Sequence, residues 1–296
     1  MLGLLLLNKP QGITSFGAVA KIKKLAGEKR VGHTGTLDPM ATGVLPILIG
    51  RATVLSQYLI EADKSYSATV KLGIETDSCD ITGNVVSQNS VSVTDADIQA
   101  ALQGFMGKQL QTPPMFSAIK QNGVRMYELA RKGETVEIPA REIEIFSLDK
   151  KSCLNEQNEF VIDCTVSKGT YIRSLCRDIG NALGTGATLT ALCRTKTAGF
   201  EIGRCVNLDD LTPENIGEYI LPCEQVVDYM PKIQVSEKQA IRFCNGGQLS
   251  LERLKESNLS DNTLYRVYFG SKMLGLGLTD LNEQSLKIQC LIDRQV

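Results

Sequence analysis

The chain contains no tryptophan and a single histidine, and only 5% of its 296 residues are aromatic. The lack of tryptophan excludes a broad stacking platform that grips single strands through aromatic side chains alone, so any base stacking must rest on a few Tyr and Phe. One histidine cannot build a His-rich metal site. The nine cysteines are an odd number and include no Cys-x-x-Cys pair, which argues against a disulfide framework and a zinc ribbon. We therefore expect reduced, mostly buried cysteines and no bound metal.

Long hydrophobic runs are missing as well. Nothing approaches the roughly 18 consecutive apolar residues of a membrane span. The apolar run 1–7 is too short, lacks a basic flank and is interrupted at Asn8-Lys9-Pro10 without a small-residue cleavage pattern. We interpret this run as a buried strand, and we expect a cytoplasmic protein that has no contact with a membrane.

The chain also lacks an excess of positive charge, since 32 Lys and Arg residues face 33 Asp and Glu residues for a net charge of -1. This balance counts against a dedicated nucleic-acid-binding protein, because phosphate contacts need clustered cations. A near-neutral total can hide a basic face. Five cations within ten residues could form such a face: Lys21, Lys23, Lys24, Lys29 and Arg30. The alternative interpretation of this cluster is a solvated helix face.

What the chain does have is a polar, Gly-rich loop at 32–43 that contains the only histidine, His33, and leads into the apolar run 44–49. Its glycines permit backbone conformations closed to other residues, while Pro39 fixes its own φ and restricts Asp38 to an extended conformation. The loop therefore holds a carboxylate on a stiff bend, as a catalytic group requires. The alternative is a simple connection in which Asp38 starts a turn, as Asp before Pro often does.

Hydrophobic spacing and capping residues predict the elements before residue 200. A helix that starts at Thr14 or Ser15 and ends at Gly27 is expected to bury Phe16, Val19, Ile22 and Leu25. Residues 73–83 are expected to be a polar connection. The other expected elements are strands at 44–49, 66–72, 143–148, 160–166 and 188–200, and helices at 52–60, from Thr94, at 125–132 and at 170–183.

Strands and helices alternate without regular βαβ spacing, which favours an α+β domain over a doubly wound one. We place a domain boundary near residue 230. The segment 231–296 combines one short helix, 236–243, with strand-like runs at 264–269, 272–278 and 286–292. The sequence therefore predicts a large domain, 1–230, and a small β-rich domain, 231–296.

Several ordered segments resemble the motifs of the TruB family of pseudouridine synthases. The loop 32–43 resembles the family's catalytic motif, and Lys64-Ser65-Tyr66 resembles its tyrosine motif. Residues 4–12 are similar to its N-terminal strand and lysine turn, 167–174 to its arginine motif, and 112–120 with 127–131 to its RNA-gripping insertion. A lone Gly-Thr-Leu-Asp would be a weak signal, whereas these segments in this order form a specific one.

The resemblance implies a mixed, largely antiparallel central sheet with flanking helices, an RNA-gripping insertion at 113–142 and a PUA-type RNA-binding domain at 231–296. It implies an isomerase that converts uridine to pseudouridine in the T-loop of tRNA, at position 55, after extruding the target base. No metal or organic cofactor is expected. We expect a monomer whose partner is tRNA and which needs no protein partner.

The resemblance also implies roles for individual residues. Asp38 would be the nucleophile, Arg173 would keep it ionised and oriented, and Tyr66 would stack on the base and relay the C5 proton. The substrate-binding residues would be His33 beside the flipped nucleotide, Tyr171 and Leu192 lining the uridine pocket, and Lys9 supporting the loop. One departure is Cys193, where the family has a second basic residue. Attack at C1′, addition to C6 and removal of the C2′ proton all remain open as the chemical route.

Two other functions remain open at this point. One is an RNA-binding or RNA-folding factor with little catalysis, although such a protein has no need for an acid, a stacking ring and a cation together. The other is a carboxylate-dependent glycosidase, which needs a second acid near Asp38. Neither Asp63 nor Asp77 lies in a motif that suggests such an acid.

Overall fold

The structure of the chain is a computed structural model that describes residues 1–117, 120–121, 124–125, 138–256 and 258–293. Most of the helix expected at 125–132 lies outside the described residues. Of the insertion expected at 113–142, two short strands are described, β8 (Lys120–Gln121) and β9 (Val124–Arg125), which pair antiparallel.

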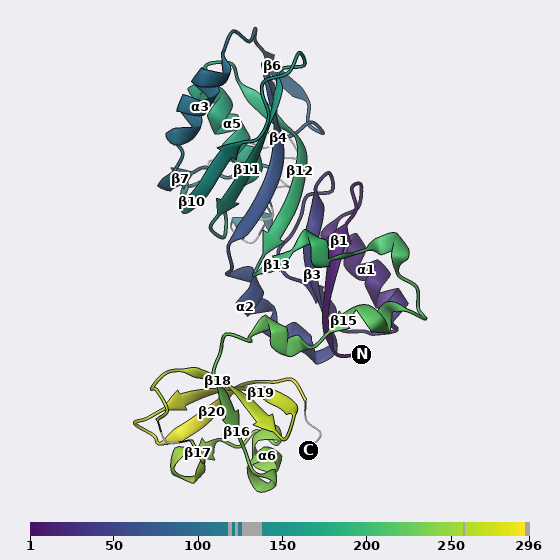
Figure 1. Cartoon of the computed structure of the whole chain (residues 1–296), viewed down its shortest axis with the longest axis vertical. Helices are drawn as coiled ribbons and strands as arrows, with labels where there is room; N and C mark the ends of the chain where they lie inside the picture. Colours follow the sequence, from purple (N-terminus) through teal and green to yellow (C-terminus); the bar gives the residue numbers. More distant parts are fainter. Residues whose placement is uncertain (118–119, 122–123, 126–137, 257, 294–296) are drawn as a thin grey trace.

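A mixed sheet, with 11 strands among the described residues, forms the larger part of the molecule (Figure 1). Its neighbours are antiparallel, except that β14 is parallel to β1 and β12 is parallel to β3. This sheet confirms the expected α+β fold. Its main path is β14 (Val206–Asn207), β1 (Gly3–Lys9), β3 (Thr42–Ile49), β12 (Ala187–Thr197), β4 (Lys64–Leu72), β11 (Glu159–Val166), β10 (Arg141–Lys150) and β7 (Gly107–Gln111); β2 (Val31–His33), β13 (Phe200–Glu201) and β15 (Ile220–Leu221) pair at its side.

Helices flank this sheet. Helix α1 (Ser15–Ala26) lies beside β1 and β2, whereas α3 (Asp95–Gln103) and α5 (Ile172–Ala182) lie together over the half of the sheet that contains β10, β11 and β12 (Figure 1). The alternating burial of β4 matches the expected one-sided strand, with Tyr66, Ala68, Val70 and Leu72 facing the core. The shorter elements are 3-10 turns at Gly50–Leu55, Ile202–Arg204, Leu208–Asp210, Ile216–Tyr219, Cys223–Val226 and Leu251–Arg253.

Helix α1 begins and ends where the sequence predicts, but its buried face differs from the prediction. The Thr14 hydroxyl accepts the Gly17 N–H at 2.9 Å, and Gly27 closes the helix with a left-handed φ of 60°. The side chain of Phe16, expected in the core, is 74% exposed. Ser15 takes the inward position instead, because its hydroxyl is hydrogen-bonded to the backbone of Leu37, and the adjacent Phe16 therefore points outward.

Two other expectations need correction. The helix expected at 52–60 is a 3-10 turn, Gly50–Leu55, followed by the short helix α2 (Ser56–Ile60). The connection expected at 73–83 contains a strand, β5 (Ile74–Thr76), which pairs with β6 (Val85–Gln88). This strand has too few apolar residues for a period-two pattern, so its formation depends on pairing with a distant segment.

Gly43 allows β3 and β12 to approach closely at the centre of the sheet. Its φ is +104°, and a Cβ there would lie 2.2 Å from the backbone oxygen of Arg194.

We expect Gly43→Ala to lower the free energy of unfolding by about 3 kcal/mol or more, because the strain of a left-handed alanine adds to the clash with the backbone of Arg194. Thermal denaturation would measure the loss. Gly184→Ala is the control, since Gly184 has a φ of +69° with nothing near its Cβ; equal melting temperatures would contradict the prediction.

The C-terminal segment forms a second sheet, with five strands among the described residues, beyond the end of the first (Figure 1). A C-terminal β-rich unit is thereby confirmed. Side chains of this unit, including Tyr268, Met273 and Leu276, share one apolar cluster with Leu4 and Leu48 of the first sheet. The elements are β16 (Lys232–Gln234), α6 (Glu237–Cys244), β17 (Leu249–Ser250), β18 (Leu264–Phe269), β19 (Lys272–Asp280) and β20 (Ser285–Leu291). None of the described helices is long and apolar enough to cross a membrane.

Candidate active site

The loop between β2 and β3 is fastened to the start of α1. The Ser15 hydroxyl donates to the Leu37 carbonyl at 3.1 Å and accepts the Leu37 N–H at 2.8 Å, and the Gly12 N–H donates to the Pro39 carbonyl at 2.8 Å. Ser15 is fully buried. These contacts on either side of Asp38 hold its backbone in one place, as a stiff catalytic loop requires.

Lys9 lies beneath this loop with its side chain buried. Its ammonium donates to the carbonyls of Pro10 and Ile13, each at 2.8 Å, and to that of Pro39 at 3.4 Å. Burial lowers the pKa of Lys9 to about 8, and the nearby Asp38 carboxylate acts in the opposite direction. The three carbonyl bonds join the first turn of the chain to the loop next to Asp38.

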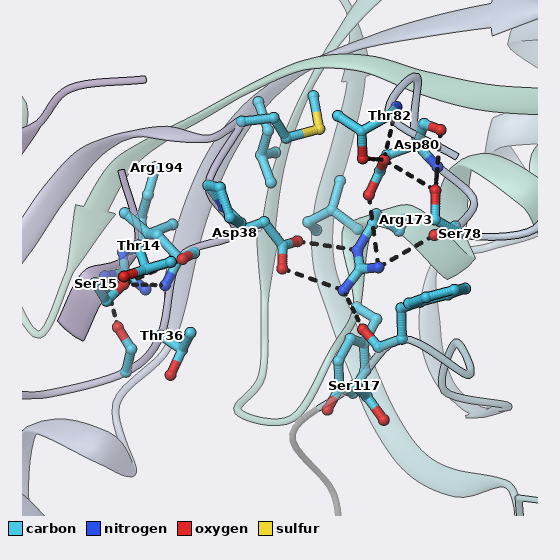
Figure 2. A pocket seen from close by; sticks show the side chains of 18 of the residues that line it. Thr14, Ser15, Thr36, Asp38, Ser78, Asp80, Thr82, Ser117, Arg173 and Arg194 are labelled. Carbon is cyan, nitrogen blue, oxygen red and sulfur yellow. Dashed lines mark hydrogen bonds and ion pairs between the residues drawn. The ribbon is translucent and has the colours of Figure 1, made fainter. Parts of the chain in front are cut away.

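Asp38 and Arg173 form a two-pronged ion pair (Figure 2). The Arg173 Nε–H donates to Asp38 Oδ2 at 2.9 Å, and Nη2 donates to Oδ1 at 3.2 Å. Arg173 is 6% exposed, whereas the Asp38 side chain is 32% exposed. The guanidinium is fixed further by the carbonyls of Ser78, at 3.1 Å, and Phe116, at 2.9 Å. The buried cation therefore orients a carboxylate that remains open to a ligand.

The environment of Asp38 raises the pKa of its carboxyl above the ordinary value. Burial is the largest cause; the Arg173 cation opposes it, and the negative charge of Asp80 adds to it. A carboxylate with a raised pKa is a stronger base and nucleophile than a solvated one. The site thus combines an activated carboxylate with the cation that keeps it ionised.

Asp80 is a functional candidate that the sequence analysis missed. Its side chain is buried, its Oδ2 lies 3.6 Å from Arg173 Nη1, and its Oδ1 accepts hydrogen bonds from the hydroxyls of Ser78 and Thr82 (Figure 2). The sequence does contain a signal for it, because Ser78 and Thr82 lie two residues before and two residues after Asp80. Hydroxyl residues at this spacing are typical of a carboxylate that is held by local side chains. Asp80 thus fixes the side of Arg173 that faces away from Asp38.

A pocket of about 1300 Å³ opens above this ion pair. Lys9 lies behind the loop, and the other six of the seven predicted site residues line the pocket. These six are Asp38, Tyr66, Arg173, His33, Tyr171 and Leu192. The sheet register explains the meeting of Tyr66 and Leu192, because β4 and β12 are adjacent strands. The structure therefore brings together segments separated by more than a hundred residues.

Arg194 is the second missed candidate. It is 1% exposed and lies opposite Tyr66 in the strand pair β4–β12. Its Nε–H donates to the Val44 carbonyl at 2.7 Å, Nη2 donates to the Gly35 carbonyl at 3.2 Å, and the guanidinium hydrogen-bonds the Tyr66 side chain. A single arginine at the end of a strand pattern gives no signal in the sequence that would distinguish it from a surface residue.

His33 ends β2 at the side of the pocket. Burial, and then the Arg194 cation, lower its pKa, so the imidazole is neutral near neutral pH. Its Nδ1 is buried without a hydrogen-bond partner among the described residues. The ring is therefore available for a contact with a ligand that does not depend on its charge.

Comparison with known proteins decides the family. Residues 23–172 match the sequence model described as TruB family pseudouridylate synthase (N terminal domain). The chain belongs to the TruB family. Its next segment, 173–228, matches the model of the tRNA pseudouridylate synthase B C-terminal domain. The resemblance to the TruB family found in the motifs is therefore confirmed.

Relatives match this TruB chain over nearly its whole length, and each is named tRNA pseudouridine synthase B. The protein of Clostridium tetani is 44% identical over 278 residues, covering 94% of this chain and 95% of the relative. That of Clostridium novyi is 43% identical over 293 residues, covering 99% and 100%. That of Burkholderia lata is 40% identical over 277 residues, covering 93% and 85%.

Solved structures bear out the fold of the TruB chain. A chain of a Cbf5-Nop10-Gar1 complex aligns with a TM-score of 0.73 at 26% identity, covering 99% of this chain and 85% of its own length. A chain of an H/ACA RNP bound to a substrate RNA containing 2′-deoxyuridine aligns with a TM-score of 0.72 at 24% identity, covering 99% and 85%. The pseudouridine synthase fold expected from the motifs is therefore confirmed.

Proposed function

We propose that this TruB chain converts uridine to pseudouridine at position 55, in the T-loop of tRNA, with Asp38 as the nucleophile. The observation that carries the proposal is the two-pronged Asp38–Arg173 pair, with the carboxylate facing the pocket and the guanidinium buried beneath it. Relatives over 40% identical that are named tRNA pseudouridine synthase B support the choice of tRNA.

The reaction is an isomerisation in which no atom is gained or lost from the nucleotide. The N1–C1′ bond breaks, the uracil turns, and a C5–C1′ bond forms as the C5 proton is replaced by one at N1. Asp38 can serve by attacking C1′, by adding to C6 or by removing the C2′ proton, since each needs only an ionised carboxylate. Arg173 keeps that carboxylate ionised and aimed along the same line in all three cases.

The pocket walls fit a flipped nucleotide. Tyr66, 8% exposed, offers its ring for stacking on the uracil, and burial raises the pKa of its hydroxyl, so the phenol is neutral and can relay the C5 proton. His33, Tyr171 and Leu192 complete the walls. A volume of about 1300 Å³ exceeds a base alone and leaves room for adjoining parts of the RNA.

Extruding a stacked base costs a few kcal/mol, which contacts elsewhere must offset. We assign these contacts to the insertion 113–142 and to a PUA-like RNA-binding domain, 231–296, beside a catalytic domain, 1–230. Folded RNA of this kind is recognised by shape more than by sequence. The enzyme would act as a monomer on tRNA without a protein partner, which light scattering would test.

A carboxylate-dependent glycosidase fits the site less well. Such an enzyme needs a second acid facing the reacting bond. Asp63 is exposed and does not line the pocket, and Asp77 accepts two hydrogen bonds from Asn84. Asp80 is turned to Arg173 and its neighbouring hydroxyls. A binding factor without catalysis would have no use for the raised pKa of Asp38.

The test is tritium release from an unmodified tRNA transcript labelled at uridine C5. We expect the purified protein to release one equivalent of tritium, and none above background from a transcript whose T-loop uridine at position 55 is cytidine. Loss of the signal in that transcript assigns the reaction to this position. Equal release from both transcripts, or binding of tRNA without release, would reject the proposed function.

The pH dependence offers a separate prediction. The rate constant kcat/KM should rise with pH through the pKa of Asp38 in the free enzyme. Because the Asp80 carboxylate raises that pKa, Asp80→Asn should move the acid limb of the profile to lower pH. The control is Asp77→Asn, in the same loop but bonded to Asn84, which should leave the limb in place. An Asp80→Asn limb that moves upward or stays fixed would count against this electrostatic assignment.

A further inference from the structure

The side chain of Phe16 is exposed at the mouth of the Asp38 pocket. It is 74% exposed, and it lines the pocket together with Thr14, Ser15 and Thr36. It is absent from each of the apolar clusters found among the described residues. Exposing a phenylalanine forgoes the stabilisation that its burial would contribute, and its place at the pocket makes the ring accessible to a ligand.

The backbone beneath Phe16 is rigidly tied to the catalytic loop. Thr14 caps the helix through the Gly17 N–H, and Ser15 exchanges two hydrogen bonds with Leu37, the residue before Asp38. Phe16 lies between these two contacts. Its backbone therefore has a fixed relation to the backbone of Asp38, as a residue that positions a substrate needs.

Phe16 heads one face of α1, which we call the outer face and define as Phe16, Ala20, Lys23 and Lys24. These residues follow the spacing i, i+4, i+7 and i+8, which places them on one side of a helix. Among the described residues, neither lysine forms an ion pair with a carboxylate at 4 Å or less. An exposed ring followed by two available cations is the combination that binds unpaired nucleic acid, through stacking and phosphate contacts.

We propose that Phe16 stacks on an unpaired base of the substrate RNA next to the extruded uridine, and that Lys23 and Lys24 contact the phosphates of the same strand. The inference rests on the proposed function, because extrusion of one base leaves the face of its neighbour uncovered. A ring at the pocket mouth covers that face and stabilises the extruded state. Phe16 is thus a positioning residue that makes no contact with the reacting atoms.

The absence of tryptophan provides a direct measurement. Phe16→Trp introduces the only tryptophan of the chain, and its fluorescence emission should be quenched when a T-arm RNA stacks on it. The quenching should depend on RNA concentration in the same way as the fraction of RNA bound. The control is Phe146→Trp, at a side chain that is 44% exposed on β10 and does not line the pocket. Its emission should not change. Unchanged emission from Phe16→Trp at saturating RNA would overturn the proposal. So would blue-shifted emission in the free protein that RNA does not alter, because it would mean that the protein itself covers the ring.

Kinetics separates stacking from simple packing. Phe16→Leu, apolar but without a ring, should lower kcat/KM by about 10- to 100-fold, whereas Phe16→Tyr should retain the wild-type value within about threefold. All variants should have the melting temperature of the wild type, because the side chain is exposed. Equal kcat/KM for the leucine and tyrosine variants would overturn the proposal. The fluorescence titration needs no turnover, so a failure of the wild type to release tritium would reject the proposed function without affecting the test of stacking.

Discussion

Asp38→Asn should reduce the rate of tritium release by at least about 10⁴-fold, because the variant lacks the carboxylate that attacks the nucleotide or removes its proton. The amide has nearly the same shape as the carboxylate, and its oxygen can still accept one hydrogen bond from Arg173. The pocket walls are unchanged by the substitution. Binding of tRNA should therefore remain within a few-fold of the wild type, and the loss should appear in kcat under saturating RNA.

A matched control separates chemistry from folding. Asp77→Asn makes the same replacement at another carboxyl that lines the pocket, and it should retain most activity. Both variants should melt close to the wild type, since both side chains are partly or fully exposed. An Asp38→Asn protein that kept a tenth of the wild-type rate would move the nucleophile to another residue.

Arg173→Lys should lower kcat/KM by about 10²- to 10³-fold, because an ammonium cannot reproduce the planar, forked geometry of the guanidinium. Arg173 donates to both oxygens of Asp38 and to the carbonyls of Ser78 and Phe116. A lysine would leave some of these acceptors without a donor and Asp38 free to rotate. Since the Arg173 cation lowers the pKa of Asp38, the weaker contact should also move the acid limb of kcat/KM to higher pH.

The control for this substitution lies one turn along the same helix. Arg177 is more exposed than Arg173 and donates to Asp178 and to the Thr112 carbonyl. Arg177→Lys should alter kcat/KM by no more than a few-fold and leave the acid limb unmoved. If the two lysine variants behaved alike, the orientation of Asp38 by Arg173 would not be the source of the effect.

The parts of the fold that the sequence predicted have their causes in nearby residues. The alternation of Tyr66 to Leu72 produces a strand with one buried face, and Thr94 with Asp97 forms the capping box of α3. Gly27 ends α1 because it adopts the left-handed conformation that the turn requires. In each case the cause lies within about ten residues, so a pattern along the chain suffices to find it.

The unpredicted parts depend on contacts between distant segments. The outward position of Phe16 follows from the bond between Ser15 and Leu37. Asp80 and Arg194 gain their meaning only when β4, β12 and α5 meet around one pocket. Asp38, Tyr66 and Arg173 were found only because a family resemblance supplied their association; their local patterns alone allow a turn, a core ring and a surface cation.

The most direct test of the central claim is to map pseudouridine by mass spectrometry in one unmodified tRNA transcript treated with wild type or Asp38→Asn. We expect one pseudouridine, at position 55 in the T-loop, with the wild type and none with the variant. Pseudouridine formed only at other positions would contradict the proposed substrate, and pseudouridine at position 55 after treatment with Asp38→Asn would contradict the proposed nucleophile.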